Sequence, residues 1–210
     1  LEFRRVLFRS DPAGVIAANI EPHRVLGSLI YFSTDVERPG VIRHTEGNRL
    51  SLGEPDGGKS ERSKAIGDAL NKAGLRCRVS SNYRQEIWVK LLGNVAFNPI
   101  SALTRATLVK MTEDAEVCGI VRHIMEETEA IAARLGVEMP VSIDQRIAGA
   151  AKMGEHKTSM LQDLELGRPF ELEAIAGVLV ELGERLNIPT PYIRTVYACA
   201  KLLDTTLRSS

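Results

Sequence analysis

The feature that most constrains the fold of this chain is a change of hydrophobic period at Asn82. From Asn82 onward, every long segment repeats its apolar residues with the 3.6-residue period of a helix, and no alternating segment follows. Before Asn82 the pattern is mixed, with extended segments and one helical stretch. The sequence therefore predicts an α/β part over residues 11–81, followed by an all-helical part over residues 82–208.

The helical part divides into segments that carry start and stop signals. Thr112 opens an acidic first turn, Gly136 follows the last periodic residue of that segment, and Thr190 can cap a helix that begins with proline. A residue before proline is biased away from helical geometry, so one helix is expected to end at Asn98. The predicted helices cover 83–97, 99–102, 112–135, 142–152, 159–165, 171–186 and 191–207.

The first part contains the extended segments. Residues 25–33 are rich in branched and aromatic side chains, and Pro39-Gly40 marks a turn. Residues 41–44 and 49–52 flank Glu46-Gly47-Asn48, which is typical of a hairpin.

A helix and a short strand are expected to follow. The helix is predicted over 61–73 with Gly74 as its stop, and the strand over 76–79. The stripe of the helix predicted to be buried consists of Ala65, Ile66, Ala69, Leu70 and Ala73.

Residues 53–60, GEPDGGKS, fit the phosphate-binding pattern G-x-x-x-x-G-K-[ST] at every position. In such a loop backbone N–H groups wrap a phosphate, Lys59 would reach its outer oxygens, and Ser60 would hold magnesium. The strand entering Gly53, however, is predicted to be the return arm of an antiparallel hairpin, whereas a phosphate loop follows a central strand of a parallel sheet. No later strand supplies a magnesium-positioning acid. A P-loop phosphotransferase is therefore the weaker alternative to a Gly-rich connection, and no metal site is predicted.

Composition bounds the classes of partner. The 27 basic and 27 acidic side chains balance. The chain therefore has no excess of positive charge that would indicate binding to nucleic acid or an anionic membrane, although a local basic patch is compatible with this balance. No apolar run approaches the roughly 20 residues that span a bilayer. Cys77, Cys118 and Cys199 lie in apolar-periodic segments, which predicts core thiols in a reducing cytoplasm.

The first ten residues, LEFRRVLFRS, are basic and aromatic and have no small-residue cleavage site, so they make a poor signal peptide. The string resembles a translated sequencing adaptor. Residues 1–10 are therefore predicted to be a non-native tail and are left out of the fold prediction.

Three polar residues recur at helical spacing in an apolar surrounding. Lys90, Asn94 and Asn98 are four residues apart, so they form one stripe on a helix. A lysine among bulky apolar residues is costly to bury unless an anion meets it, which indicates a binding site. The alternative is that Lys90 extends to water and the asparagines cap or bridge neighbouring helices.

A second polar group lies in residues 156–173. Ser159 could cap the helix that follows, or its hydroxyl and the freed N–H groups could receive a carboxylate. Glu171 follows a Gly-Arg-Pro turn and could merely supply an acid to the first turn of a helix. Neither residue is decisive alone.

Together these motifs resemble the ketopantoate reductase (2-dehydropantoate 2-reductase) family. The resemblance rests on Trp88-x-Lys90-x-x-x-Asn94-x-x-x-Asn98-Pro99, on Thr158-Ser159-Met160-Leu161-Gln162-Asp163, and on Glu171-x-Glu173. Upstream it includes Arg24-Val25-Leu26-Gly27, Pro39-Gly40-Val41-Ile42-Arg43-His44, and Gly53-Glu54 with Asp56-Gly57. It covers residues 11–204.

The resemblance implies a fold and an activity. The fold would be the end of a Rossmann-type NADP-binding domain, residues 11–81, followed by a helical domain of the 6-phosphogluconate dehydrogenase C-terminal type, residues 82–208, for substrate binding and dimerisation. The activity would be NADPH-dependent reduction of 2-dehydropantoate to pantoate, in the cytoplasm, on the route to pantothenate and coenzyme A. Lys90 would be the catalytic lysine; Asn94, Asn98, Ser159 and Glu171 would bind the 2-keto acid.

The chain departs from the family pattern in three places. Family members often have an asparagine near Leu108 and an Asn-Gly pair where this chain has Ala176-Gly177. The sequence also contains no G-x-G-x-x-G, the turn that seats a dinucleotide. No cofactor-binding residue is therefore assigned, and the chain as written is expected to be inactive. A noncatalytic helical interaction domain is the remaining alternative.

Overall fold

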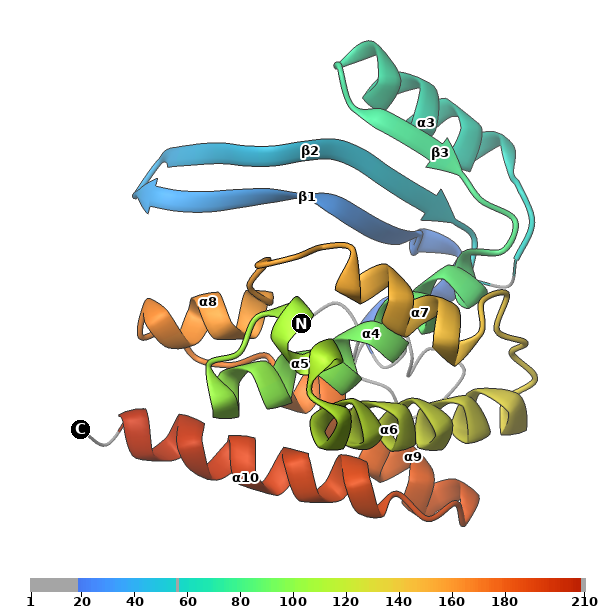
Figure 1. The fold of residues 1–210 in the computed structure, drawn as a ribbon. Coiled ribbons are helices and arrows are strands. Elements are labelled where there is room, and N and C mark those ends of the chain that lie inside the picture. The colour runs from blue at the N-terminus through green and yellow to red at the C-terminus, as the bar shows by residue number, and fades with distance from the viewer. Residues whose placement is uncertain (1–18, 56, 209–210) are drawn as a thin grey trace. The chain divides into compact units, whose positions relative to one another are not determined.

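The computed structural model describes residues 19–55 and 57–208 (Figure 1). The predicted tail, residues 1–10, lies outside the described residues. The described chain packs into two compact units, one up to Ile87 and one from Trp88 onward. A small sheet precedes a mostly helical unit, which confirms the predicted fold class.

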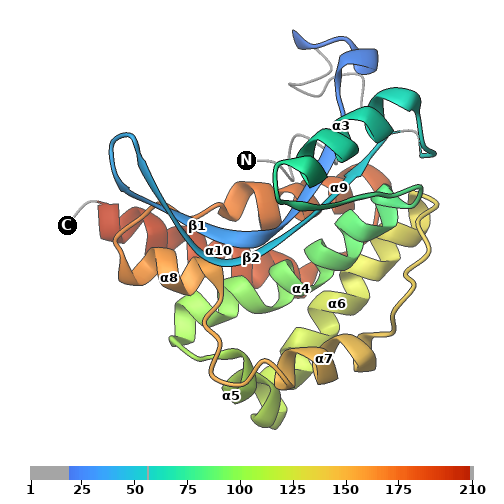
Figure 2. The ribbon, with the colours of Figure 1, turned by 90° about the horizontal axis from the view of Figure 1, so that it is seen from above.

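The first unit is built on a three-stranded mixed sheet. Its strands are β1 (Gly27–Arg38), β2 (Val41–Gly53) and β3 (Arg76–Val79), preceded by a short 3₁₀ turn, Pro22–Arg24. The sheet order is β1-β2-β3, with β2 antiparallel to β1 and parallel to β3. Figure 2 shows the long β1–β2 hairpin, and Figure 1 shows α3 beside β3. The strand entering Gly53 is the return arm of a hairpin, as predicted, but it also has a parallel neighbour.

The hairpin turn lies at Pro39–Gly40, and the hairpin predicted around Glu46-Gly47-Asn48 is wrong. The register passes from Tyr31 opposite Arg49 to Ser33 opposite Glu46, so β2 has one extra residue there and bulges. Gly47 has a φ of +72°, and a Cβ on it would lie 2.4 Å from the carbonyl oxygen of Tyr31. The glycine signal therefore marks a bulge within one strand.

Helix α3 (Glu61–Lys72) and β3 occupy the predicted ranges, and Gly74 follows the helix with a φ of +93°. The predicted buried stripe of α3 is wrong, because Ile66 is 43% exposed while Ser63 and Gly67 are buried. A Cβ on Gly67 would lie 2.9 Å from Cγ2 of Val79. The helix thus approaches the sheet through its small residues, and its apolar stripe is rotated away.

The side chain of Tyr83 packs against the end of the β1–β2 hairpin at Gly27 and Gly53. Gly27 and Gly53 are paired across β1 and β2, and a Cβ on Gly27 would lie 1.9 Å from the Tyr83 ring. A Cβ on Gly53 would lie 2.2 Å from Cβ of Tyr83, which is 2% exposed. Both glycines leave room for this aromatic side chain.

The second unit is helical. Its elements are α4, which begins in the first unit (Tyr83–Thr104), α5 (Leu108–Glu113), α6 (Ala115–Arg134), α7 (Ile143–Ala151), α8 (Ser159–Glu165), a π-helical turn (Glu173–Gly177), α9 (Val178–Leu186) and α10 (Pro191–Arg208). The ranges of α7, α8 and α10 agree with the prediction within one residue at each end, and Pro191 is the first residue of α10, as predicted.

The predicted end of a helix at Asn98 is wrong, because α4 continues through Pro99 to Thr104. Leu91, Leu92, Val95 and Ala96 are all fully buried. Burial on nearly every side of this stretch outweighs the local preference of the residue before proline.

The predicted start of a helix at Thr112 is also wrong. Asp114 separates α5 from α6, and its carboxylate accepts a hydrogen bond of 2.9 Å from the N–H of Val117. Asp114 was the better cap, since its ionised oxygen meets the positive end of the helix. The helix continues to Arg134, and Gly136 follows with a φ of +73°.

Packing between α6 and α10 fixes the C-terminal helix. The carboxylate of Glu127 on α6 accepts hydrogen bonds of 2.9 Å from the N–H groups of both Tyr192 and Ile193. His123 stacks on the Tyr192 ring, with centroids 4.4 Å apart. An acid of one helix therefore satisfies the first turn of another, a contact that the sequence pattern did not predict.

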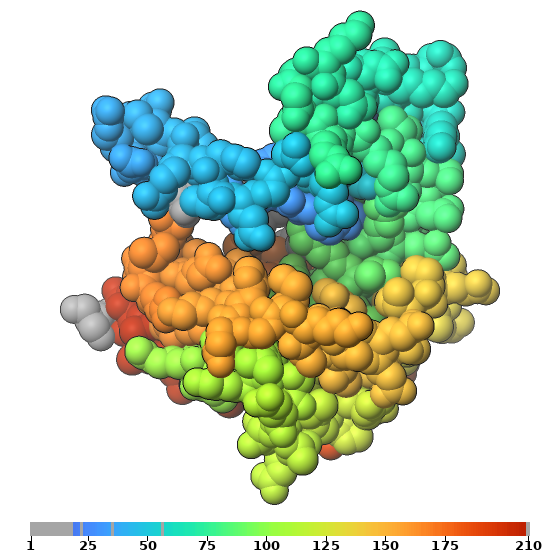
Figure 3. All heavy atoms as spheres, turned by 45° about the horizontal axis from the view of Figure 1, so that its top comes forward, coloured from blue at the N-terminus to red at the C-terminus, as the bar shows by residue number. Residues whose placement is uncertain are grey.

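The segment between α7 and α8 lies against α5, as Figure 3 shows for the orange and lime segments. The N–H of Leu108 donates to the carbonyl oxygen of His156 at 3.1 Å, and the hydroxyl of Thr107 donates to Glu155 at 2.8 Å. These bonds hold the start of α8.

The prediction of core thiols is wrong. Cys199 is exposed, and Cys77 and Cys118 are half-buried; all three are free thiols. Apolar neighbours in the sequence are therefore not enough to bury a cysteine side chain.

Candidate active site

Helix α4 carries the first three predicted site residues. Lys90 and Asn94 are half-buried, and Asn98 is 5% exposed. Spacing of four residues places them along one side of the helix. The residues between them, including the fully buried Leu91, Leu92 and Val95, pack into the core. The stripe is therefore the polar side of an otherwise buried helix.

Ser159 is the first residue of α8, so the alternative in which it caps this helix is wrong. The cap is Thr158, whose hydroxyl accepts a hydrogen bond of 3.2 Å from the N–H of Leu161. Thr158 and Met160 are buried, whereas Ser159 is exposed. Because its neighbour caps the helix, the Ser159 hydroxyl is available for other contacts.

One of these contacts joins the two predicted groups. The side-chain amide of Asn98 donates a hydrogen bond to Oγ of Ser159, with a distance of 3.4 Å between nitrogen and oxygen. This distance is at the long end for a hydrogen bond, so the two groups are adjacent without being tightly locked. Residues from α4 and α8 thus meet at one place.

Glu171 is fixed through its neighbours. Phe170 and Leu172 are buried, and Glu171 between them is exposed. The N–H of Phe170 donates to the carboxylate of Asp204 on α10 at 3.2 Å. The carbonyl oxygen of Glu171 accepts from the N–H groups of Ala174 and Ile175. The backbone at Glu171 is therefore anchored on both sides.

The helix after Glu171 starts with a π-helical turn, an irregularity often found near functional sites. Glu173 in this turn accepts a hydrogen bond of 2.7 Å from the hydroxyl of Tyr197, and Lys201 lies 3.0 Å from the same carboxylate. The Tyr197 hydroxyl and the Glu173 carboxylate raise the pKa of Lys201 well above its usual range. Sequence analysis missed this cluster, because its members come from two helices.

Two of the departures from the family pattern, at Leu108 and at Ala176-Gly177, fall on residues that the structure describes. Ala176 is fully buried, and a Cβ on Gly177 would lie 2.5 Å from Oε2 of Glu173. Leu108 is half-buried at the start of α5.

The convergence of Lys90 with Glu171 stays a prediction. Both residues belong to the helical unit. The contact between Asn98 and Ser159 joins two of the five predicted site residues.

The Gly-rich loop satisfies its own polar groups. The N–H of Gly57 donates to the carbonyl oxygen of Glu54 at 3.0 Å. The Ser60 hydroxyl donates to the carboxylate of Glu54, and it caps α3 by accepting from the N–H of Ser63 at 3.1 Å. Arg62 lies 2.5 Å from the same carboxylate. The N–H of Gly57 and the hydroxyl of Ser60, which a bound phosphate and magnesium would need, are thus already used.

The motifs on α4 and α8 lie inside a region that matches a known domain. The family description "Ketopantoate reductase PanE/ApbA C terminal" matches residues 82–204. The chain belongs to the ketopantoate reductase family. All five predicted site residues of this family member fall within the matched region, and its helical unit carries the family's C-terminal domain.

This ketopantoate reductase family member is similar in sequence to several proteins named 2-dehydropantoate 2-reductase. A 2-dehydropantoate 2-reductase of Mesorhizobium japonicum is 49% identical over 92% of this chain and 59% of its own length. One of Archaeoglobus fulgidus is 29% identical over 82% of this chain and 58% of its own length. The chain therefore spans about three fifths of the length of these relatives.

Solved structures agree with this fold. The crystal structure of 2-dehydropantoate 2-reductase from Methylococcus capsulatus is 36% identical, with a TM-score of 0.82 over 91% of this chain and 69% of that one.

Among the residues that the structure describes, no helix combines the length and hydropathy that a membrane crossing requires.

Proposed function

We propose that this chain is the substrate-binding part of an NADPH-dependent 2-dehydropantoate 2-reductase, which makes pantoate for pantothenate and coenzyme A synthesis. The observation that carries the proposal is the hydrogen bond between Asn98 and Ser159. It brings together two residues, from separate helices, that are predicted to bind the substrate. Membership of the ketopantoate reductase family supports the reaction class.

Lys90 has the central chemical role. As a ketone is reduced, negative charge grows on its oxygen, so an ammonium aimed at that oxygen stabilises the transition state more than the ground state. The same ammonium then donates the proton that completes the new hydroxyl. The half-buried position of Lys90 suits this role, because a partly desolvated charge interacts more strongly with its target.

The remaining residues hold the substrate. Ser159 binds the carboxylate of the keto acid through its hydroxyl, and Glu171 accepts a hydrogen bond from the terminal hydroxyl of the substrate. Asn94 and Asn98 contact the substrate from α4. A site that pairs a hydroxyl and a carboxylate with separate partners also rejects analogues that lack either group.

The Gly-rich loop does not fit a dinucleotide. The sequence contains no G-x-G-x-x-G, and within residues 53–60 the N–H of Gly57 and the hydroxyl of Ser60 already donate to Glu54. A nicotinamide would supply the hydride, and no residue of this chain is assigned to it. The loop contacts also count against the P-loop phosphotransferase.

The proposal includes four further points. Residues 11–81 are the end of the nucleotide domain and residues 82–208 are the substrate domain. The substrate is a small 2-keto acid, the assembled enzyme is a homodimer, and it acts in the cytoplasm.

The test fuses a family-type nucleotide domain in front of Asp11 and follows NADPH oxidation with 2-dehydropantoate as substrate. Lys90→Ala should lower kcat by at least about 100-fold, because it removes both the charge and the proton donor. Lys110→Ala is the matched control, since Lys110 is exposed on α5. It should leave kcat within about twofold.

A fused protein that folds and binds both ligands but oxidises NADPH equally with and without Lys90 would contradict the proposal. ATP binding that needs magnesium and Lys59 would favour the phosphotransferase instead. The unfused chain should show no measurable NADPH oxidation.

A further inference from the structure

One face of the sheet in the first unit carries a cluster of arginines that the proposed reductase site does not use. Arg49 lies on β2, and Arg76 and Arg78 lie on β3. In the register of these parallel strands Arg49 is paired with Arg76, and Ser51 with Arg78. Paired residues share a face, and so do residues two apart, so all three arginines project from the same side of the sheet.

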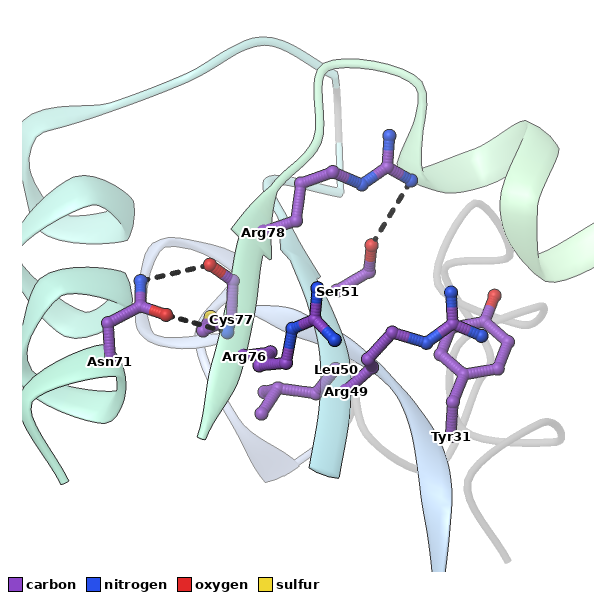
Figure 4. Close-up of a pocket in the computed structure, with 8 residues that line it drawn as sticks. All are labelled: Tyr31, Arg49, Leu50, Ser51, Asn71, Arg76, Cys77 and Arg78. Carbon is purple, nitrogen blue, oxygen red and sulfur yellow. Dashed lines mark hydrogen bonds between the residues drawn. The ribbon is translucent and has the colours of Figure 1, made fainter. Parts of the chain in front are cut away.

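The three arginines line a pocket of about 590 Å³, a size typical of a small-molecule site. Figure 4 shows their side chains around it, with Tyr31 at one end. The described residues that line the pocket include no carboxylate. Among the described residues, Arg78 alone of the three arginines makes an ion pair, with Glu86 at 2.7 Å.

The pairing of Arg49 with Arg76 leaves charge unbalanced. Like charges directly opposite each other on neighbouring strands are unfavourable. Among the described residues, neither Arg49 nor Arg76 has an acidic partner. An edge strand often carries charges that prevent aggregation, but Arg49 lies on the central strand of this sheet. An anion bound between the two guanidinium groups would remove the repulsion.

Contacts with neighbouring side chains restrain Arg49 and Arg78. Arg49 lies over the ring of Tyr31, 5.5 Å from its centroid. Arg78 is held by Glu86, whose carboxylate also accepts a hydrogen bond of 2.7 Å from Ser51. Guanidinium groups bind phosphate oxygens through paired hydrogen bonds. The contacts of Arg49 and Arg78 lower the entropic cost of ordering these two side chains around a ligand.

Asn71 fixes the strand between the other two arginines. Its side chain both donates to the carbonyl oxygen of Cys77, at 3.0 Å, and accepts from the N–H of Cys77, at 2.9 Å. Cys77 separates Arg76 from Arg78, so this double contact from α3 sets the position of both.

We propose that Arg49, Arg76 and Arg78 form a binding site for the oligophosphate group of a small molecule. The guanidinium groups come from two strands, and Arg78 lies two residues further along β3 than Arg76. A single phosphate is too small to contact all three, whereas linked phosphates offer oxygens to each. The ligand is either free oligophosphate or the diphosphate of a nucleotide.

The test is calorimetric titration of the 210-residue chain at low ionic strength with pyrophosphate and, separately, with ADP. The double variant Arg49→Gln/Arg76→Gln should weaken binding by at least about tenfold, because it removes two charge-assisted contacts. Arg134→Gln is the control, since Arg134 is exposed on α6 of the other unit. It should change the affinity by less than about twofold.

Tighter binding of ADP than of pyrophosphate identifies a nucleotide, and the reverse identifies a free oligophosphate; either supports the site. Absence of binding by both probes, or equal affinity in the double variant, overturns it. A second measurement needs no variant. Pyrophosphate should protect Arg49 and Arg76 of the unaltered chain, but not Arg134, from phenylglyoxal, as followed by mass spectrometry; equal modification with and without pyrophosphate also overturns the site.

Discussion

The side-chain amide of Asn98 donates to the hydroxyl of Ser159, which lies 61 positions further along the chain. The hydrogen bond connects the middle of a buried helix with the first residue of a short one. The contact brings two predicted site residues together, and it is also the bridge between helices that the structural alternative predicts. Binding of one substrate by both residues therefore stays a proposal.

The coupling between these two residues can be measured by unfolding. Asn98→Ala, Ser159→Ala and the double variant form a cycle, and the two residues should couple by about 0.5–1 kcal/mol, as expected for a long hydrogen bond. Urea denaturation followed by circular dichroism gives the free energies of unfolding. Strictly additive effects would mean that the contact is absent in solution.

The Gly-rich loop should behave as a helix cap. Ser60→Ala should lower the free energy of unfolding by about 1 kcal/mol, since it removes the cap of α3 and the contact with Glu54. Lys59→Ala changes an exposed residue of the same loop and should have little effect. If Ser60→Ala is instead neutral while the parent chain binds magnesium and ATP, the cap interpretation fails.

Glu127 should contribute to the stability of α10. Glu127→Gln replaces a charged acceptor of two N–H groups at a helix start, so the free energy of unfolding should fall by about 1 kcal/mol. Glu138→Gln, at an exposed position, serves as the control. Thermal unfolding in low and high salt measures both. An equal effect of the two substitutions would contradict this assignment.

Glu129 predicts a dependence of stability on pH. Burial, and next the nearby charge of Glu126, raise the pKa of Glu129 above its usual value. The folded state then holds this proton more tightly than the unfolded state, so the contribution to stability is full below the unfolded pKa and is lost as pH rises through the folded pKa. Glu129→Gln should therefore be more stable than the parent at pH 7 and lose that advantage near pH 4. Urea denaturation at both pH values measures this, and an advantage unchanged by pH would contradict it.

The sequence predicted the parts of the fold that depend on local signals. The ranges of α7, α8, α10 and β3 followed from period, caps and proline placement. The errors lie where long-range packing decides. Burial carries α4 through Pro99, and Gly47 is a bulge because the carbonyl of Tyr31 lies against it.

The same division holds for the site. Spacing alone placed Lys90, Asn94 and Asn98 on one side of a helix, and the resemblance supplied Ser159 and Glu171. The Glu173–Tyr197–Lys201 cluster and the arginine pocket escaped prediction, because no local pattern links residues from different elements. Gly53 and Ser60 show the opposite case, in which a complete motif has a structural origin: room for Tyr83 and the cap of α3.

The most direct test of the substrate site is a crystal structure of this chain with bound pantoate. The account predicts that Nζ of Lys90 lies about 3 Å from the oxygen on the second carbon of pantoate, at hydrogen-bond distance. It also predicts the carboxylate of pantoate at Ser159 and its terminal hydroxyl at Glu171. Pantoate bound elsewhere, or bound here with the Lys90 amine directed away from that oxygen, would contradict the account.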